Sequence, residues 1–253
     1  MKRKYLIPVL ISILGAILSA NAFTICNKKD IMVEGKGGFA VVELFTSEGC
    51  SSCPPADKAI AELLARNTDN IYVLSYHVDY WNRLGWKDVF SKPEFSARQQ
   101  QYAPHFSSEG VYTPQVIVNG ATQFVGSDEG KLNDAISNNL KRDMSSDLSI
   151  RISQNNNAVS VSFDINEQDV VLLNIAIVQL QAATNVKRGE NSGRMLHHVN
   201  IVREFKTINA KGRGDITIEI PKELSGIPLE LIAFTQGKNS FKILGADKKK
   251  INI

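Results

Sequence analysis

The chain has 253 residues, of which 43% are hydrophobic, and a formal net charge of +3 from 29 Lys and Arg against 26 Asp and Glu. Three of the basic residues stand at positions 2–4, and without them the charges balance, so the chain lacks the basic excess of a nucleic-acid-binding protein. This length suits one large or two modest domains.

The first 22 residues have the pattern of a secretory signal peptide. A basic start is followed by an apolar run at residues 5–18 and by Ala20-Asn21-Ala22, which fits a small-x-small cleavage site. The apolar run is shorter than the about 20 residues of a membrane span, and an uncleaved N-terminal anchor is the alternative. We therefore expect a signal peptide at residues 1–22, a periplasmic or secreted protein, and no stable membrane insertion after the signal is removed.

Residues 23–38 have the composition of a flexible leader, polar and with glycines near the end. This segment contains Cys26, the third cysteine of the chain, which has no neighbour in sequence with which to pair. A free thiol is the expectation for Cys26, and a mixed disulfide with another chain is the alternative.

Strand and helix patterns alternate from residue 39 to residue 144. The predicted elements are a strand at 39–45, a helix at 52–66, a strand at 71–77, a helix at 93–106, a hairpin around Asn119-Gly120 and a helix at 128–142. An Asn-Gly turn between apolar runs is a strong hairpin signal. The order β-α-β-α-β-β-α is that of thioredoxin, so we expect a thioredoxin-like domain here.

Period-2 alternation of apolar and polar residues replaces the helical patterns after residue 144. It is clearest at residues 148–152, 159–163 and 216–220, and residues 170–178 form a more continuous apolar run. Several short strands without helices predict a sandwich or small barrel. The predicted fold class is therefore α/β, with a thioredoxin-like domain at 39–144 followed by an all-β sandwich-like domain at 145–253.

The most informative motif is Cys50-Ser51-Ser52-Cys53, between a predicted strand and a predicted helix. A helix N-terminus stabilises a thiolate, so Cys50, expected to be the more exposed cysteine, would attack a substrate and Cys53 would resolve the mixed disulfide. The alternatives are a static structural disulfide or half of a metal site. A metal would need about four ligands and hence convergence of the histidines, so we expect no metal and no cofactor.

Two further features are candidates for the same catalytic site. Thr113-Pro114 precedes the third predicted strand, where a cis proline would present the backbone of Thr113 to an extended substrate; an ordinary trans turn is the alternative. Glu43, seven residues before Cys50, would accept the proton of Cys53, or it faces solvent.

A polar and aromatic stretch follows the second predicted strand and contains both tryptophans. Strand ends of this kind often line sites in α/β folds, so His77, Asp79 and Trp81, together with Tyr112, are candidate substrate-binding residues. The alternative is a packed, hydrogen-bonded loop.

Several long segments resemble a bacterial family of exported proteins, the domain-of-unknown-function family twelve-twenty-three. They are Glu43–Asp57, His77–Trp81, Leu84–Asp88, Val111–Gln115, Phe124–Asp128 and Arg188–Arg194, followed by Leu196, His198, Asn200 and Val202-Arg203. The resemblance covers about residues 39–245. It implies an exported thioredoxin-like domain followed by a β-rich domain, and it supplies no reaction.

A charged group in the second half of the chain completes the candidate residues: Arg188, Glu190, Arg194 and His198. Surface ion pairs contribute only about 0–1 kcal/mol, so we consider substrate or ligand binding, with a structural domain interface as the alternative. The leading hypothesis is a thiol–disulfide oxidoreductase that acts on protein or small-molecule thiols and disulfides. The alternatives are a redox-inert binding module with a structural disulfide and, more weakly, a metal chaperone.

Overall fold

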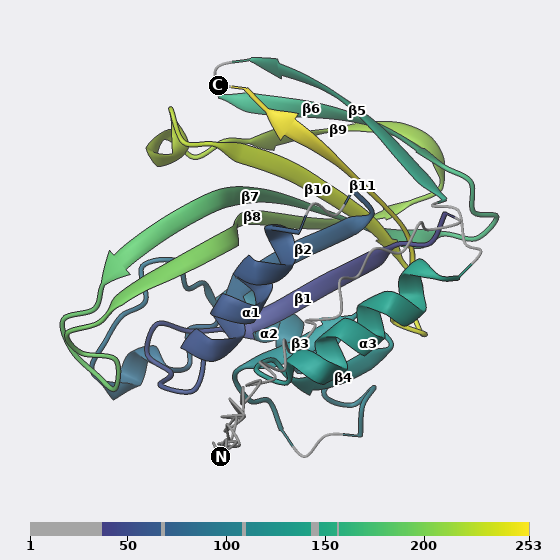
Figure 1. The fold of residues 1–253 in the computed structure, drawn as a ribbon. Coiled ribbons are helices and arrows are strands. Elements are labelled where there is room, and N and C mark those ends of the chain that lie inside the picture. Colours follow the sequence, from purple (N-terminus) through teal and green to yellow (C-terminus); the bar gives the residue numbers. More distant parts are fainter. Residues whose placement is uncertain (1–36, 67–68, 108–109, 143–146, 156, 253) are drawn as a thin grey trace, which may run out of the picture. The chain divides into compact units, whose positions relative to one another are not determined.

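The computed structural model describes residues 37–66, 69–107, 110–142, 147–155 and 157–252 (Figure 1). The expected signal peptide at residues 1–22, Cys26 and almost all of the expected leader lie outside the described residues. So does most of the expected boundary between residues 144 and 147.

The described residues form three α-helices and eleven strands. In chain order they are β1 (Ala40–Thr46), α1 (Pro54–Leu64), β2 (Ile71–His77), α2 (Pro93–Tyr102), β3 (Gln115–Val118), β4 (Thr122–Val125), α3 (Glu129–Leu140), β5 (Leu148–Asn155), β6 (Ala158–Ile165), β7 (Val171–Asn185), β8 (Met195–Ala210), β9 (Gly212–Glu219), β10 (Leu229–Gln236) and β11 (Ile243–Ile251), with short 3-10 helices at Asn82–Leu84 and Lys222–Leu224.

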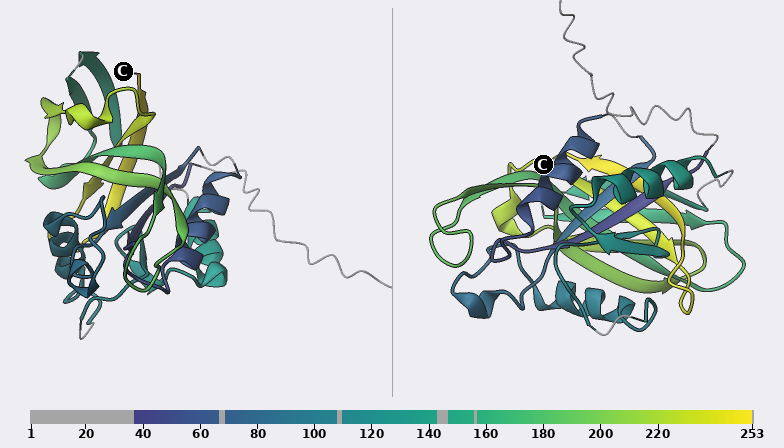
Figure 2. Two further views of the ribbon diagram at one scale, coloured as in Figure 1. Left: turned by 90° about the vertical axis from the view of Figure 1, so that its left-hand side faces the viewer. Right: turned by 60° about the horizontal axis from the view of Figure 1, so that its bottom comes forward.

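Eight of the strands make one mixed sheet in the order β11-β10-β7-β8-β2-β1-β3-β4 (Figures 1 and 2). β1 and β2 are parallel, whereas β3 is antiparallel to β1. The junction between the two halves of the chain is the parallel pairing of β2 with β8 at Ser75 and Ile201. Side chains reinforce it, because Ser75 Oγ donates to the carbonyl of Val199 at 2.8 Å and Asn200 Nδ2 donates to that of Val73 at 3.1 Å.

The predicted fold class, a thioredoxin-like α/β domain followed by a separate all-β sandwich-like domain, is therefore wrong. The structure is mostly β, and its large sheet takes strands from both halves of the chain. The physical reason is that period and turn signals are local, whereas the pairing of β2 with β8 joins segments far apart in sequence. No local pattern in either strand specifies this partner.

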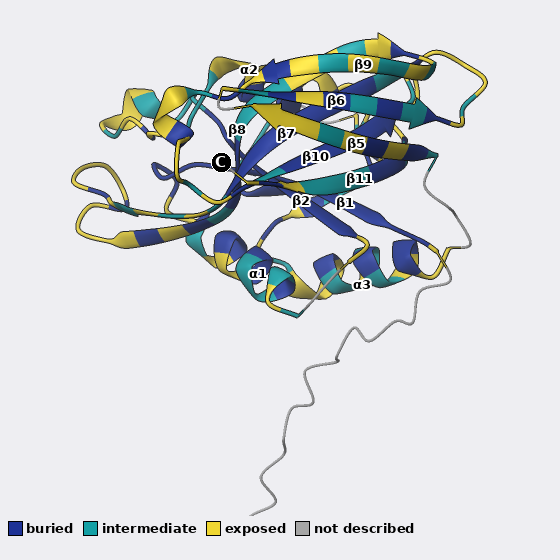
Figure 3. Cartoon of the chain, turned by 90° about the horizontal axis from the view of Figure 1, so that it is seen from above, coloured by how far each residue is buried: buried dark blue, intermediate teal, exposed yellow. Residues whose placement is uncertain are grey.

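Helices cover both faces of the β1 region. β1 is buried along its whole length, as expected for a strand with both faces covered. α1 and α3 lie on one face (Figure 3), where a Cβ at Gly126 would approach the Cβ of Ala56 to 3.0 Å and Leu44 Cδ1 to 3.2 Å. On the other face, Phe45 packs with Phe95 and Tyr102 of α2. Alternate residues of β1 therefore point to different layers.

A second, three-stranded sheet with the order β5-β6-β9 packs against the β7, β10 and β11 part of the large sheet. Its strands alternate between buried and more exposed positions, as in β6, and the inward residues, such as Val159 and Val161, meet Leu173, Ile175 and Leu231. This alternation is what the sequence predicted for the second half. The resulting core is distinct from the one beside α2.

A buried ion pair joins the two halves near α2. Arg98 Nε lies 2.5 Å from Glu43 Oε1, and the Arg98 side chain is 6% and that of Glu43 0% exposed. The Arg98 guanidinium also lies 4.8 Å from the ring centre of Phe205 and 5.2 Å from that of Phe234. Residues from β1, α2, β8 and β10 thus enclose one charge pair where the two halves of the chain meet.

None of the helices in the described part of the chain is both long and apolar enough to span a membrane.

Candidate functional site

Cys50 and Cys53 form a disulfide in the turn between β1 and α1. Cys53 is the N-cap of α1, and prolines occupy the first two helical positions, where missing N–H groups cost little. Ser52 Oγ lies 3.3 Å from Cys50 Sγ. Both cysteines are 0% exposed, so the expectation that Cys50 would be the more exposed one is wrong.

The loop at residues 186–194, which connects β7 to β8, lies against the cysteine turn. Asn191, fully buried on this loop, donates from Nδ2 to the backbone carbonyls of Glu48 and Cys50, both at 2.9 Å. A segment remote in sequence therefore holds the backbone on the N-terminal side of the disulfide.

The same loop also binds Ser51, one of the two residues between the cysteines. Glu190 Oε2 accepts hydrogen bonds from Ser51 N at 3.1 Å and from Ser51 Oγ at 2.6 Å. These bonds hold the pKa of the Glu190 carboxyl below its ordinary value. Arg194 Nη1 donates to Asn191 Oδ1 at 2.9 Å. Glu190 thus reaches the cysteine turn, and Arg194 supports Asn191, which bonds to that turn, whereas Arg188 is exposed on the loop.

Five buried ionisable side chains surround this turn, and we call them the acid–imidazole cluster: Glu48, Asp57, His77, Asp88 and His198. Their exposed fractions lie between 0% and 8%. Two of them, His77 and His198, were predicted as substrate-binding residues; their burial places them beneath the turn instead of on an open surface.

Direct contacts link four members of this cluster, Glu48, His77, Asp88 and His198. His77 Nδ1 lies 2.7 Å from Asp88 Oδ2, which also accepts from the backbone N–H of Glu48 at 2.8 Å. The rings of His77 and His198 meet edge to face at 4.8 Å, and His198 Nε2 lies 3.5 Å from Glu48 Oε1. Asp57 Oδ2 accepts from Thr46 Oγ1 at 3.3 Å.

Burial and neighbouring charge set the protonation of the cluster. Burial raises the pKa of Asp57, and His198 and His77 only partly oppose the rise. For Asp88 burial alone would raise the pKa, but the adjacent His77 outweighs it and the pKa is lowered. For His77 burial alone would lower the pKa, but Asp88 outweighs it and the pKa is raised. The pair is therefore held as imidazolium and carboxylate, next to a carboxyl that favours its neutral form.

The predicted Thr113-Pro114 element approaches the turn from another side. The Thr113–Pro114 peptide bond is cis, as predicted. Trp81 Nε1 donates to Thr113 Oγ1 at 2.7 Å, and a Cβ at Gly49, the residue before Cys50, would lie 3.2 Å from Trp81 Cβ. Trp81 therefore connects the proline segment to the cysteine turn.

Three predicted residues are bound elsewhere. Tyr112 donates from its hydroxyl to Gln123 Oε1 at 2.5 Å, and Asp79 Oδ1 accepts from Ser96 Oγ at 2.5 Å. Glu43 has both carboxylate oxygens bound at 2.5 Å, one to Arg98 and one to the Tyr102 hydroxyl. Because Glu43 shares its face of β1 with Phe45, it points toward α2 and away from α1, so the structure does not bring it to Cys53.

Asp57, Glu48 and Asn191 were not predicted as members of the site. Asp57 had a usable signal, because it stands four residues after Cys53 in a helical pattern and such residues share one helix face. No sequence signal indicated Glu48 or Asn191, since their roles depend on where the long β7–β8 hairpin folds back onto the cysteine turn.

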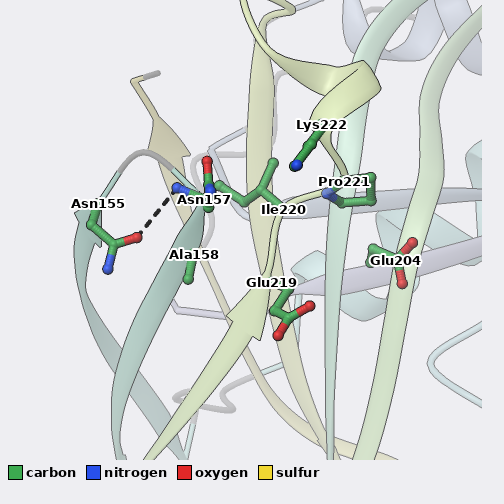
Figure 4. Close-up of a pocket in the computed structure, with 8 residues that line it drawn as sticks. All are labelled: Asn155, Asn157, Ala158, Glu204, Glu219, Ile220, Pro221 and Lys222. Atoms are coloured by element: carbon green, nitrogen blue, oxygen red, sulfur yellow. Dashed lines mark hydrogen bonds between the residues drawn. The ribbon is translucent and has the colours of Figure 1, made fainter.

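Two cavities are relevant to ligand binding. One of about 290 Å³ lies beside α1 and is lined by Pro54, Asp57, Lys58, Ala61, Arg194, Met195, Leu196 and His197. A larger one of about 640 Å³ lies at the small sheet and is lined by Asn155, Asn157, Ala158, Glu204, Glu219, Ile220, Pro221 and Lys222 (Figure 4). Only the first contains predicted site residues or cluster members. Within the described residues no His, Cys, Asp and Glu side chains are grouped so as to hold a metal ion.

Comparisons with known proteins give similar solved structures and one family. The crystal structure of protein AGR_C_4864 from Agrobacterium tumefaciens is similar at 25% sequence identity and a TM-score of 0.65, over 86% of this chain and 97% of that chain. HBP35 of Porphyromonas gingivalis is similar at 15% identity and a TM-score of 0.57, over 85% of this chain and 76% of that chain, which is a likeness of fold alone. A comparison with curated proteins found no match. The family model described as "Protein of unknown function (DUF1223)" matches residues 41–236, and the chain therefore belongs to the DUF1223 family.

Proposed function

We propose that the protein is a thiol–disulfide oxidoreductase that exchanges disulfides through Cys50 and Cys53. The observation that carries the proposal is the position of this disulfide at the start of α1, beside five buried ionisable side chains. Buried ionisable groups are costly for stability and concentrate at functional sites, where they tune proton transfer. A bond that serves only to stabilise the fold needs no such surroundings.

The short span of the disulfide also favours exchange over a structural role. Cys50 and Cys53 are separated by three positions. By loop-closure entropy, so small a ring stabilises a fold by about 2 kcal/mol, compared with about 4.7 kcal/mol for a loop of 100 residues. The turn is already fixed by α1 and by the bonds from Asn191, so the disulfide adds little constraint.

Exchange requires that the loop at residues 186–194 move away, because Cys50 is fully buried. The cavity of about 290 Å³ beside α1 adjoins both Pro54 and Arg194 and is the approach we assign to the substrate. Lys58 and Arg194 give its rim positive charge, which favours an incoming thiolate. The substrates are protein or small-molecule thiols and disulfides, and the signal-like residues 1–22 support a periplasmic or secreted site of action.

The test is the reduction potential of the Cys50–Cys53 pair, measured on the protein without residues 1–22 by equilibration with glutathione and quantification of free thiols. A potential between about −120 and −270 mV, the range of known exchangers, supports the proposal. In addition, Cys53→Ser should trap mixed disulfides at Cys50, and Cys50→Ser should trap none.

The second candidate, a redox-inert binding module with a structural disulfide, is favoured by one observation, the complete burial of both cysteines. A potential below about −300 mV, together with no trapped species in Cys53→Ser, would support this candidate and exclude exchange.

A further inference from the structure

The acid–imidazole cluster contains buried polar atoms that make no hydrogen bond with any residue that the structure describes. They are Glu48 Oε1, His77 Nε2 and both ring nitrogens of His198. Leaving a buried polar group unpaired costs about 1–3 kcal/mol. Such a cost at several neighbouring atoms indicates groups that are kept for proton transfer instead of for stability.

Glu48 Oε1 and His198 Nε2 lie close to each other, and the His77 ring lies against that of His198. Asp88 fixes His77 through Nδ1, which leaves Nε2 free. Trp86 Nε1 donates to Glu48 Oε2 at 2.7 Å, which leaves Oε1 facing His198 at 3.5 Å. Carboxylate and imidazole thus alternate across the cluster, an arrangement in which one added proton can be shared.

The cluster adjoins the disulfide on both sides. Glu48 is two residues before Cys50, and Asn191 bonds the carbonyls of both. Asp57 is one helical turn after Cys53, with its backbone N–H donating to the Cys53 carbonyl at 3.1 Å, so its side chain lies on the helix face of Cys53. Asp57 also lines the cavity beside α1, which gives the buried carboxyl a route to solvent.

We propose that the cluster balances the protons of the disulfide: Asp57 donates a proton to Cys53 when the bond opens, and His198, beside Glu48, takes up a proton from solvent to compensate the carboxylate left behind. This inference rests on the proposed exchange at Cys50. It gives the second half of the chain a direct part in the reaction, because His198 belongs to β8.

The proposed exchange conserves protons and electrons at each step. A substrate thiolate attacks Cys50 Sγ, the S–S bond breaks, and its electron pair leaves on Cys53 Sγ, which takes the Asp57 proton. A second substrate thiolate then attacks the substrate sulfur of the mixed disulfide and displaces Cys50 as a thiolate. The substrate dithiol is oxidised to a disulfide, the Cys50–Cys53 pair is reduced, and the reverse sequence reduces a substrate disulfide.

The groups facing Asp57 set the expected pH behaviour. His198 of β8 and His77 of β2 face it with charge that favours the carboxylate, and Asp88 opposes them. Lys58, Arg194 and His197 line the same cavity. The neutral form of Asp57 that burial favours is the form required of a proton donor. Because His77 is already held as an imidazolium by Asp88, His198 is the imidazole that we assign to take up a proton when Asp57 ionises.

The experiment follows the four histidines of the chain by NMR through their ring Cε1–H signals, from pH 5 to pH 9, in the oxidised protein and after reduction by dithiothreitol. We expect the His198 midpoint to rise by at least half a pH unit on reduction, whereas exposed His105 stays unchanged. In Asp57→Asn the rise should disappear, because no new carboxylate forms. His105→Gln is the matched control and should leave the His198 shift intact.

A His198 midpoint that is the same in both redox states, or that does not titrate in either, would overturn the inference, and so would a shift that persists in Asp57→Asn. The readout needs only chemical reduction of the disulfide. A failure of the proposed function, seen as a potential below about −300 mV with no mixed disulfide, is therefore distinguishable from a failure of the proton link.

Discussion

Replacement of Asn191 by Ala should make the Cys50–Cys53 disulfide far more reducible without changing either cysteine. Asn191 is fully buried and donates two 2.9 Å hydrogen bonds to backbone carbonyls of the cysteine turn. When the loop is closed, both carbonyls lack the Asn191 donor in the variant but not in the parent protein. When the loop is open, water binds both carbonyls in the variant and in the parent alike. The substitution therefore weakens closure specifically.

The magnitude follows from those two bonds. A buried acceptor left without its donor costs about 1–3 kcal/mol. The Glu48 carbonyl is left in this state, whereas the Cys50 carbonyl still accepts from the Cys53 N–H at 3.2 Å, so we take a total of about 2–3 kcal/mol. Since about 1.4 kcal/mol is a factor of ten, the open fraction should rise between about 30-fold and about 140-fold. When opening is fast relative to thiol attack, the reduction rate rises by the same factor.

The assay is the rate of reduction by dithiothreitol under native conditions, followed by thiol release at several reductant concentrations. Ser192→Ala is the matched control, since this exposed neighbour bonds only within the loop, to the carbonyl of Lys187 at 3.0 Å. Its rate should match the parent protein. An Asn191→Ala rate within threefold of the parent, or reduction with the urea dependence of global unfolding, would refute local opening of the loop.

Three further predictions concern stability. Arg98→Met should lower the free energy of unfolding in urea by about 3–5 kcal/mol, because it leaves the Glu43 carboxylate buried without its cation, and adding Glu43→Gln should recover much of this loss; no recovery would refute the pairing. Gly120→Ala should lower the thermal unfolding midpoint far more than Gly212→Ala. Both glycines have a positive φ, which costs about 1–2 kcal/mol for alanine. Of the two, only Gly120 would bring the new Cβ against a backbone carbonyl oxygen, at 1.9 Å. His77→Asn should lower the free energy of unfolding in urea more at pH 6 than at pH 9, because the pKa of His77 is raised in the folded protein. The stability that this raised pKa provides is fully present below the unfolded pKa near 6.5 and is lost as the pH rises through the folded pKa. A loss of stability that does not depend on pH would contradict this prediction.

Local patterns were sufficient to predict the elements before residue 144 and four of the later strands, but not β8, β10 or β11, and not the assembly of the sheets. The start of α1 is predicted by the two prolines after Cys53. The turn between β3 and β4 is predicted by the Asn-Gly pair at residues 119–120. Both signals act within a few residues. The fold class failed at β2, whose partner β8 is more than a hundred residues away. A run of buried residues shows that a strand has both faces covered, and it does not show which strand lies next to it.

The candidate site divides in the same way. Cys50, Cys53 and the cis bond before Pro114 were predictable from neighbouring residues. Glu43 was assigned to the wrong side of the sheet because alternation along β1 shows that faces differ without showing which face α1 covers. His198 was identified within a charged segment, but its place beneath the cysteine turn depends on the pairing of β7 with β8.

In the proposed exchange, the loop at residues 186–194 and the acid–imidazole cluster act together. Asn191 bonds the carbonyls of Cys50 and Glu48 at once, so a movement that admits a thiolate to the sulfur also loosens the segment that carries Glu48 beside His198. Water that enters there lowers the cost of charge on Asp57, because burial is what raises its pKa. Substrate access and proton release by Asp57 are therefore expected to occur together. With the loop closed, the Cys50–Cys53 disulfide stays oxidised and Asp57 stays protonated.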